Sequence, residues 1–200
     1  MKRKYYLGNA LFSFDGTVNT IVDLRSTLSC VQGNNPRSVS FMIQTTTSSG
    51  CHNVLTTGSG SNDGTAFGIQ FACDGSTKSI IAFNGAYVVY IPSGGEVIND
   101  GLWHTVLVTY DGITLTIYVD GRLDNTATNW NTGSSATIAS TLNTIGNDGN
   151  YLGSWANTGG RWIGKMKNVQ FYNYVITNTY ALANSYQTAG SVIYNSGNSF

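Results

Sequence analysis

Carboxylates are the first side chains to test for chemistry, because hydrolysis of a glycosidic bond with retention needs a nucleophile and an acid about 5 Å apart. Only one of the ten acidic residues in this 200-residue chain is a glutamate, Glu96. Seven of the nine aspartates directly precede a glycine, namely Asp15, Asp63, Asp74, Asp100, Asp111, Asp120 and Asp148. Aspartate before glycine is typical of turns. We therefore expect no catalytic residues and no enzymatic activity.

The two histidines offer little further chemistry. His52 follows Cys51, but neighbouring residues of a strand point to opposite faces, so the two side chains do not form a Cys-His nucleophile. His104 follows Trp103 at the head of an expected strand. We expect His104 to make a structural hydrogen bond.

The three cysteines, Cys30, Cys51 and Cys73, match neither a CxxC metal site nor a disulfide framework. A hairpin whose loop centres near Ser61 and Asn62 places Cys51 across from Cys73. No secretory signal is visible, so we expect free thiols.

Binding chemistry is more promising in "NDGNYLGSWANTGGRW", residues 147–162, which is polar and glycine-rich yet carries three large rings. Trp162 precedes an apolar strand, so we expect it to be buried. Tyr151 and Trp155 have few aliphatic neighbours, so we expect at least one ring to stay partly exposed. An exposed ring beside amide and carboxylate groups suits the apolar face and the hydroxyl fringe of a sugar.

A second polar stretch, "DNTATNWNTGSS", adds Trp130 as another possible platform. The candidate ligand-binding residues are therefore Trp130, Asn147, Asp148, Asn150, Tyr151 and Trp155. Two alternatives stay open for these rings: packing beneath their own loops, or contact with another subunit.

Composition excludes several partners. Ten basic and ten acidic residues cancel, and three of the basic ones lie in the "MKRK" start, so the chain has no broad basic face for nucleic acid. The basic start lacks an apolar segment and a cleavage site, so no signal peptide is visible. The longest apolar runs, such as residues 86–91, are too short for membrane insertion.

The elements that position these residues read as β-strands, because apolar and polar residues alternate in short segments between turn residues. In "SVSFMIQT", Val39, Phe41 and Ile43 share one face, which predicts a half-buried strand. Ile113, Leu115, Ile117 and Val119 share a face in a later strand. Asn84-Gly85, Asp111-Gly112 and Asp120-Gly121 are expected turns.

The expected core consists of the apolar residues on these inner faces: Phe14, Phe41, Ile43, Val106, Val108, Leu115, Ile117, Ile145, Val169 and Phe171. A closing strand should run from Trp162 to Phe171 with one kink near Gly164. One short helix is expected within residues 177–186, with Thr177 or Asn178 as its N-cap.

We therefore predict an all-β fold, an antiparallel two-sheet jelly-roll sandwich with one short C-terminal helix. A single domain should span residues 10–187, after a basic segment at residues 1–9 and before a tail or edge strand at residues 188–200.

The ordered set "LFSFDG", "SVSFMIQT", "DGLWHTVLVTYDGITLTIYVDG", "TIGN" and "WIGKMKNVQFYNYVIT" resembles the laminin-G-like jelly rolls of the concanavalin A-like lectin and glucanase superfamily. The resemblance covers about residues 10–186. It implies two antiparallel sheets of six or seven strands with a concave face and a rim of loops.

Two features of the family are absent from this sequence, and their absence argues against glucanase activity and a calcium site. Glucanases of this superfamily carry two glutamates flanking an aspartate on one strand, which a chain with the single Glu96 cannot provide. Many relatives hold Ca²⁺ with acidic residues where this chain has Asn19, Lys167 and Asn168. We therefore expect no cofactor, with a weak Ca²⁺ site at Asp15 and backbone carbonyls as the remaining alternative.

Two functional hypotheses follow. The first is a non-catalytic recognition module that binds glycans, or other proteins, at a cell or particle surface. The second is a structural or assembly protein of a virus particle or surface layer, in which the same rings serve as interface anchors and the chain forms a homo-oligomer. Either hypothesis places the protein on a virion or an extracellular surface; otherwise the missing signal peptide predicts a cytoplasmic protein.

Overall fold

The computed structural model describes residues 2, 4–7, 10–24, 35–48, 50–58, 66–71, 80–83, 97–127, 149–153 and 160–178. Within these ranges the chain forms twelve strands and one short 3₁₀ helix, η1. Their bounds are β1 Lys4–Tyr6, β2 Phe12–Asp15, η1 Val18–Thr20, β3 Val22–Asp23, β4 Arg37–Gln44, β5 His52–Gly58, β6 Ala66–Phe71, β7 Ile80–Phe83, β8 His104–Tyr110, β9 Leu115–Val119, β10 Arg122–Ala127, β11 Gly149–Leu152 and β12 Ile163–Tyr172.

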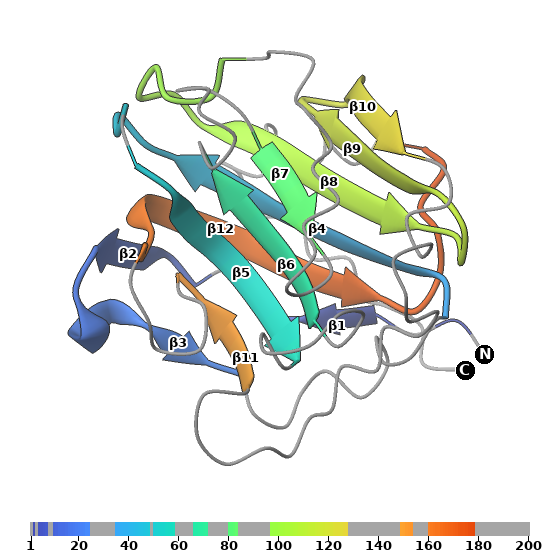
Figure 1. Ribbon diagram of the computed structural model, residues 1–200, viewed down its shortest axis with the longest axis horizontal. Coiled ribbons are helices and arrows are strands. Elements are labelled where there is room, and N and C mark those ends of the chain that lie inside the picture. Colours follow the sequence, from blue (N-terminus) through green and yellow to red (C-terminus); the bar gives the residue numbers. More distant parts are fainter. Residues whose placement is uncertain are drawn as a thin grey trace.

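The strands form two antiparallel sheets that stack face to face (Figure 1). The seven-stranded sheet has the order β1-β12-β4-β8-β9-β10, and β2 pairs with β12 beside β1. The five-stranded sheet has the order β3-β11-β5-β6-β7. This arrangement confirms the predicted all-β two-sheet sandwich.

Short turns of the expected kind join three central strands. The carboxylate of Asp111 accepts hydrogen bonds from the backbone amides of Ile113 (2.8 Å) and Thr114 (2.6 Å), which closes the turn between β8 and β9. Asp120 takes a left-handed conformation, with φ of 48°, between β9 and β10. Both predicted aspartate-glycine turns are therefore confirmed.

The core lies between the two sheets, and the inward-facing residues were largely predicted. All nine expected core residues that fall within the described ranges are at most 5% exposed. They are Phe14, Phe41, Ile43, Val106, Val108, Leu115, Ile117, Val169 and Phe171. The tenth, Ile145, lies outside the described residues, as do the Asn84-Gly85 turn and the tail at residues 188–200.

Two expectations about the strands were wrong. Ile113 does not share the buried face of β9, because the turn extends through it and leaves it 60% exposed. β4 is buried on both faces rather than half-buried. The outer face of β4 is covered by the chain that follows β12. There the Ser38 hydroxyl donates to the Tyr174 carbonyl (2.8 Å) and accepts from the Ile176 amide (3.0 Å).

β12 also contains a bulge that the sequence did not predict. The pairing of β12 with β4 shifts register between Lys167 and Gln170, where Asn168 adopts a positive φ of 54°. This bulge lies several residues beyond the kink expected near Gly164.

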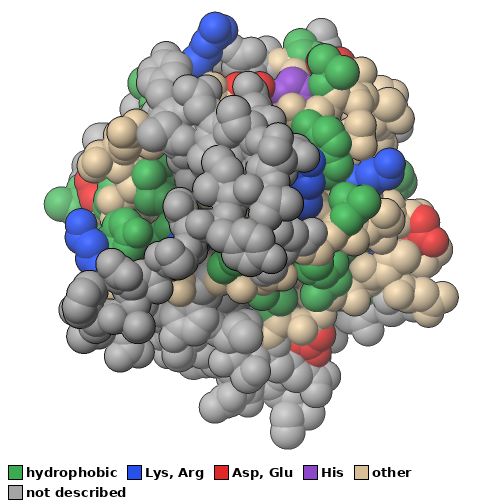
Figure 2. All heavy atoms as spheres, turned by 180° about the vertical axis from the view of Figure 1, so that it is seen from behind, with side chains coloured by type: hydrophobic (Ala, Val, Ile, Leu, Met, Phe, Trp, Pro, Cys, Tyr) green, Lys and Arg blue, Asp and Glu red, His purple; other side chains and the backbone are tan. Residues whose placement is uncertain are grey.

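Within the described part of the chain, no α-helix is present, so no helix there is long and apolar enough to cross a membrane. Thr177 and Asn178 are not helical, and the rest of the expected helix lies outside the described residues. On the face seen in Figure 2, the described basic and acidic side chains stand apart from one another and form no broad patch of one charge.

Cys51 contradicts the prediction of free thiols, because it is disulfide-bonded. Cys30 and Cys73 lie outside the described residues, so the position of Cys73 opposite Cys51 stays a prediction. Free thiols were expected from the N-terminal sequence, which carries no information about which sulfur atoms the fold brings together.

Candidate functional site

The predicted ligand-binding residues fall mostly outside the described structure. Asn150 and Tyr151 have a described backbone in β11, where Tyr151 pairs with Thr56 of β5 on one side and Asp23 of β3 on the other. The other four, Trp130, Asn147, Asp148 and Trp155, lie outside the described residues. What the structure does place is the base of the loop that carries Trp155.

Both ends of that loop meet at one point of the five-stranded sheet. Gly153 donates a backbone hydrogen bond to Val54 of β5 (2.8 Å), and Trp162 donates one to the carbonyl of Gly153 (2.9 Å). The described residues on the two sides of residues 154–159 are therefore hydrogen-bonded to each other, and residues 154–159 themselves lie outside the described structure. We call residues 154–159 the aromatic loop.

The returning end of the aromatic loop is fixed a second time against β5. The Gly160 carbonyl accepts hydrogen bonds from the backbone amide (2.5 Å) and the side-chain amide (3.0 Å) of Asn53. A Cβ atom on Gly160 would lie 2.6 Å from the Cys51 carbonyl oxygen, and the residue has a positive φ of 73°. Glycine is therefore required at this position.

His52 adds a third anchor that the sequence did not reveal. Its Nδ1 atom donates to the Arg161 carbonyl (2.8 Å), and its Nε2 atom lies 3.4 Å from the Thr47 hydroxyl. The side chain is 8% exposed. His52 thus connects the end of the aromatic loop to the segment after β4.

The side chain of Trp162 lies in the core beneath the base of the loop. It is fully buried, as predicted, and packs edge-on against Phe71 with ring centroids 5.9 Å apart. Of the three large rings in residues 147–162, Trp162 therefore belongs to the core, as predicted. The exposure of Tyr151 and Trp155 stays a prediction.

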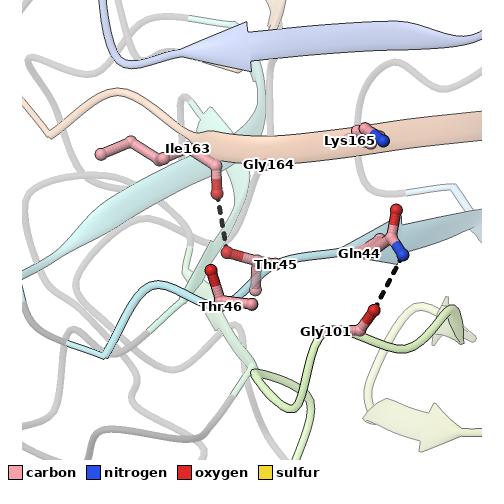
Figure 3. A pocket seen from close by; sticks show the side chains of 7 residues that line it. All are labelled: Gln44, Thr45, Thr46, Gly101, Ile163, Gly164 and Lys165. Carbon is pink, nitrogen blue, oxygen red and sulfur yellow. Dashed lines mark hydrogen bonds between the residues drawn. The ribbon is translucent and has the colours of Figure 1, made fainter.

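A pocket of about 280 Å³ lies beside this anchor, between the end of β4 and the start of β12 (Figure 3). Its lining residues come from three segments: Gln44, Thr45, Thr46, Gly101, Ile163, Gly164 and Lys165. The Thr45 hydroxyl donates to the Ile163 carbonyl (2.7 Å), and the Gln44 amide donates to the Gly101 carbonyl (2.8 Å). These two hydrogen bonds tie the three segments together around the pocket.

Gly164 keeps the pocket open. A Cβ atom there would lie 2.5 Å from the Gln44 carbonyl oxygen and 3.1 Å from Thr45, and φ is 146°. Without a side chain, β12 can approach β4 closely and still leave space above the backbone. Sequence reasoning identified Gly164 only as a kink and missed the pocket, because its lining residues are far apart in the chain.

His104 does make the structural hydrogen bonds expected of it. Its Nδ1 donates to Asp120 (2.8 Å) and its Nε2 donates to Asp100 (3.0 Å), so both ring nitrogens carry a proton. The hydrogen bond to Asp120 outweighs the effect of burial and raises the pKa of His104 to about 9. A histidine that stays protonated at neutral pH cannot act as a general base there.

The carboxylates of Asp100 and Asp120 also accept hydrogen bonds from backbone amides. The pKa of Asp100 is lowered by its hydrogen bonds to His104 and to the Leu102 amide. Burial raises the pKa of Asp120, but hydrogen bonds from His104 and the Thr105 amide outweigh it, so the net shift is downward. The cluster is a clamp between the start of β8 and the end of β9, not a catalytic site.

The residues at the calcium positions that the resemblance implies make other contacts in the described structure. The Asp15 carboxylate accepts from the Thr17 amide (2.8 Å) and the Thr20 hydroxyl (3.1 Å) within its own turn. Lys167 places its ammonium 4.2 Å over the ring of Trp103, and the Asn168 amide donates to the sulfur of Met42. Within the described ranges, no three His, Cys, Asp or Glu residues could hold a metal ion together.

Comparison with known proteins agrees with the architecture. A laminin-G family model, described as the concanavalin A-like lectin/glucanases superfamily, matches residues 15–180. No curated protein matches the sequence significantly.

Solved structures with a similar fold include two sugar complexes. The chain resembles the CBM40 of the Ruminococcus gnavus IT-sialidase bound to α2,3-sialyllactose, with 14% identity, a TM-score of 0.61 and coverage of 92% of this chain and 97% of that one. It also resembles domain 4 of an extracellular GH43 arabinanase from Geobacillus stearothermophilus in complex with arabinotriose, with 16% identity, a TM-score of 0.56 and coverage of 91% and 87%.

A sialidase from Trypanosoma rangeli is similar over a smaller part of its length. The match has 16% identity and a TM-score of 0.52, and it covers 80% of this chain but only 24% of the sialidase. At such identities these likenesses establish the fold alone.

Proposed function

Because the chain belongs to the concanavalin A-like lectin/glucanase superfamily, we propose that it is a non-catalytic recognition module that binds glycans at a cell or particle surface. Two of its structural relatives were solved with a bound sugar, and this chain covers most of each. The likeness to the sialidase covers only a quarter of that enzyme and gives no support for catalysis.

The anchoring of the aromatic loop is the observation that carries this proposal. Backbone hydrogen bonds join Gly153 to Val54 and to Trp162, and Asn53 and His52 hold the two residues before Trp162. Because its two ends are fixed, this segment has less conformational entropy to lose on binding than a chain of the same length with free ends. Trp155 and Tyr151 would stack on the sugar, with Asn147, Asp148 and Asn150 around them and Trp130 as a second platform.

Four of the six described aspartates support a non-catalytic role. Asp15, Asp100 and Asp111 each accept a backbone amide two residues further along, and Asp120 binds the Thr105 amide and His104. Each carboxylate therefore has a structural duty in a turn or a clamp. The disulfide at Cys51 supports a location outside reducing compartments, such as a cell or particle surface.

A glycan array probed with the purified chain tests the proposal. The wild type should bind a defined set of glycans, and Trp155→Ala should abolish this binding while leaving the melting temperature within a few degrees. Tyr6→Ala is the matched control, because it removes a ring that is 45% exposed on the edge strand β1, and it should bind as the wild type does.

Two outcomes would overturn the proposal. One is an array without binding, together with a homo-oligomer in light scattering that Trp155→Ala dissociates; this would favour the assembly protein. The other is a large loss of stability in Trp155→Ala with unchanged glycan binding, which would place that ring in the core.

A further inference from the structure

The pocket between β4 and β12 carries three polar groups with unused hydrogen-bonding capacity. Within the described part of the chain, the Lys165 ammonium has no ion pair or hydrogen bond, the Thr46 hydroxyl has no partner, and the Gln44 side-chain oxygen accepts nothing. Lys165 and Gln44 are directly opposite each other in the pairing of β12 with β4. One cation, one hydroxyl and one amide oxygen thus line the same pocket, with Lys165 and Gln44 on one side and Thr46 on the other (Figure 3). The side chains of Lys165 and Thr46 are exposed to solvent.

The acidic groups nearest in the chain are already engaged. Asp100 precedes the lining residue Gly101, and its carboxylate accepts from the Leu102 amide and from His104. Asp15 is paired with Ile163 across β2 and β12, and its carboxylate accepts from Thr17 and Thr20. No carboxylate lines the pocket among the described residues, so Lys165 gives it a net positive charge.

Lys165 also differs from most of the other described cationic side chains, because it does not lie over an aromatic ring of the described residues. The ammonium of Lys167 sits over Trp103, and the guanidinium of the buried Arg37 lies between the rings of Phe67 and Tyr110. A lysine that has no partner, in a pocket that has no acid, is suited to a negatively charged group.

The remaining walls suit one sugar ring. The volume of about 280 Å³ is at the lower limit for ligand pockets, which span about 300–1,000 Å³. Ile163 is 42% exposed and offers an apolar surface, and Gly101 and Gly164 add no side chain to the walls. Apolar C–H groups, hydroxyls and one anionic group would all find a partner here.

We propose that this pocket binds one acidic sugar residue, whose carboxylate or sulfate pairs with the Lys165 ammonium while its hydroxyls bind Thr46 and Gln44. The inference rests on the proposed glycan-binding function and adds the class of sugar. The three pocket residues of β12, Ile163, Gly164 and Lys165, follow the anchored residues 160–162 directly in the chain.

The test compares Lys165→Gln with the wild type on paired glycans that share a neutral core and differ only by a sialic acid, a uronic acid or a sulfate. Arg122→Gln is the matched control, because it removes the same charge from an exposed residue on β10, three strands away from β4. Lys165→Arg should restore binding, because it keeps the charge.

We expect the wild type to prefer the acidic member of at least one pair, and Lys165→Gln to weaken that binding by about tenfold to a hundredfold. The neutral core should bind both proteins equally, and Arg122→Gln should change nothing. Sialylated, uronate and sulfated pairs then distinguish the source of the anionic group.

Equal affinity for acidic and neutral members, or an equal loss in Lys165→Gln and Arg122→Gln, would overturn the acidic-sugar proposal and leave glycan recognition standing. Absence of binding to every glycan, acidic or neutral, would overturn both proposals.

Discussion

Raising the pH from 6.5 to 9.5 should destabilise the protein through His104. A folded-state pKa of about 9, against an ordinary value of 6.5, means that the folded protein holds this proton more tightly than the unfolded chain does. The stabilisation is therefore fully present below pH 6.5, and it is lost as the pH rises through 9.

The size of the effect follows from the shift and from the exposure of the partners. At about 1.4 kcal/mol per pKa unit, the shift sets a ceiling of about 3 kcal/mol. The side chains of Asp100 and Asp120 are 38% and 34% exposed, so solvent screening reduces the expected loss to about 1–2 kcal/mol. For a chain of this length, that loss lowers the melting temperature by roughly 2–8 °C.

Thermal denaturation followed by circular dichroism between pH 6 and 10 measures this loss, and Asp120→Asn provides the comparison. Asparagine tolerates the positive φ of residue 120 and can still accept the Thr105 amide, so the variant removes mainly the charge. Its melting temperature should change less over this pH range. A His104 imidazole that titrates near 6.5 by NMR, or an alkaline slope identical in both proteins, would refute the reasoning.

Other predictions concern the core, the loop base, the cysteines and acid stability. Ile117→Ala should cost about 2–5 kcal/mol in chemical denaturation, because Ile117 is fully buried between the sheets, and a cost below about 0.5 kcal/mol would contradict its place there. Gly160→Ala should lower both stability and glycan affinity, since the Cβ meets the Cys51 carbonyl, and a variant that melts as the wild type does would show that the loop base is not tight. With one disulfide among three cysteines, thiol titration of the denatured, unreduced chain should find one free thiol, and three would contradict the bond at Cys51. The pKa values of Asp100 and Asp120 are lowered, so their contribution is present above about pH 4 and is lost on further acidification, which an acid titration of Asp120→Asn should show as a smaller loss than in the wild type.

Local sequence patterns predicted the strands and turns because those features depend on neighbouring residues. Alternation placed Val39, Phe41 and Ile43 on the inner face of β4, and Asp111 before glycine identified the turn between β8 and β9. The burial of Ser38 could not be read in the same way, because its cover is the segment at residues 174–176, more than a hundred positions away.

The site was predicted less completely for the same reason. Trp162 was recognised as a core residue from the apolar strand that follows it. The pocket depends on Gln44, Gly101 and Gly164 meeting across three segments, and no local pattern indicates such a meeting. His52 likewise has an ordinary strand context in the sequence, and only the fold brings it to the Arg161 carbonyl.

Mapping of a bound glycan by NMR tests the central claim most directly. The amide resonances of the ¹⁵N-labelled chain would be followed during titration with the glycan that gives the strongest array signal. The account predicts that the largest shifts fall in residues 149–165, with the smaller ones in residues 44–46 and 101. Shifts concentrated on another surface, such as the β9–β10 edge, or no shifts at millimolar glycan, would contradict the assignment of glycan recognition to the aromatic loop and its pocket.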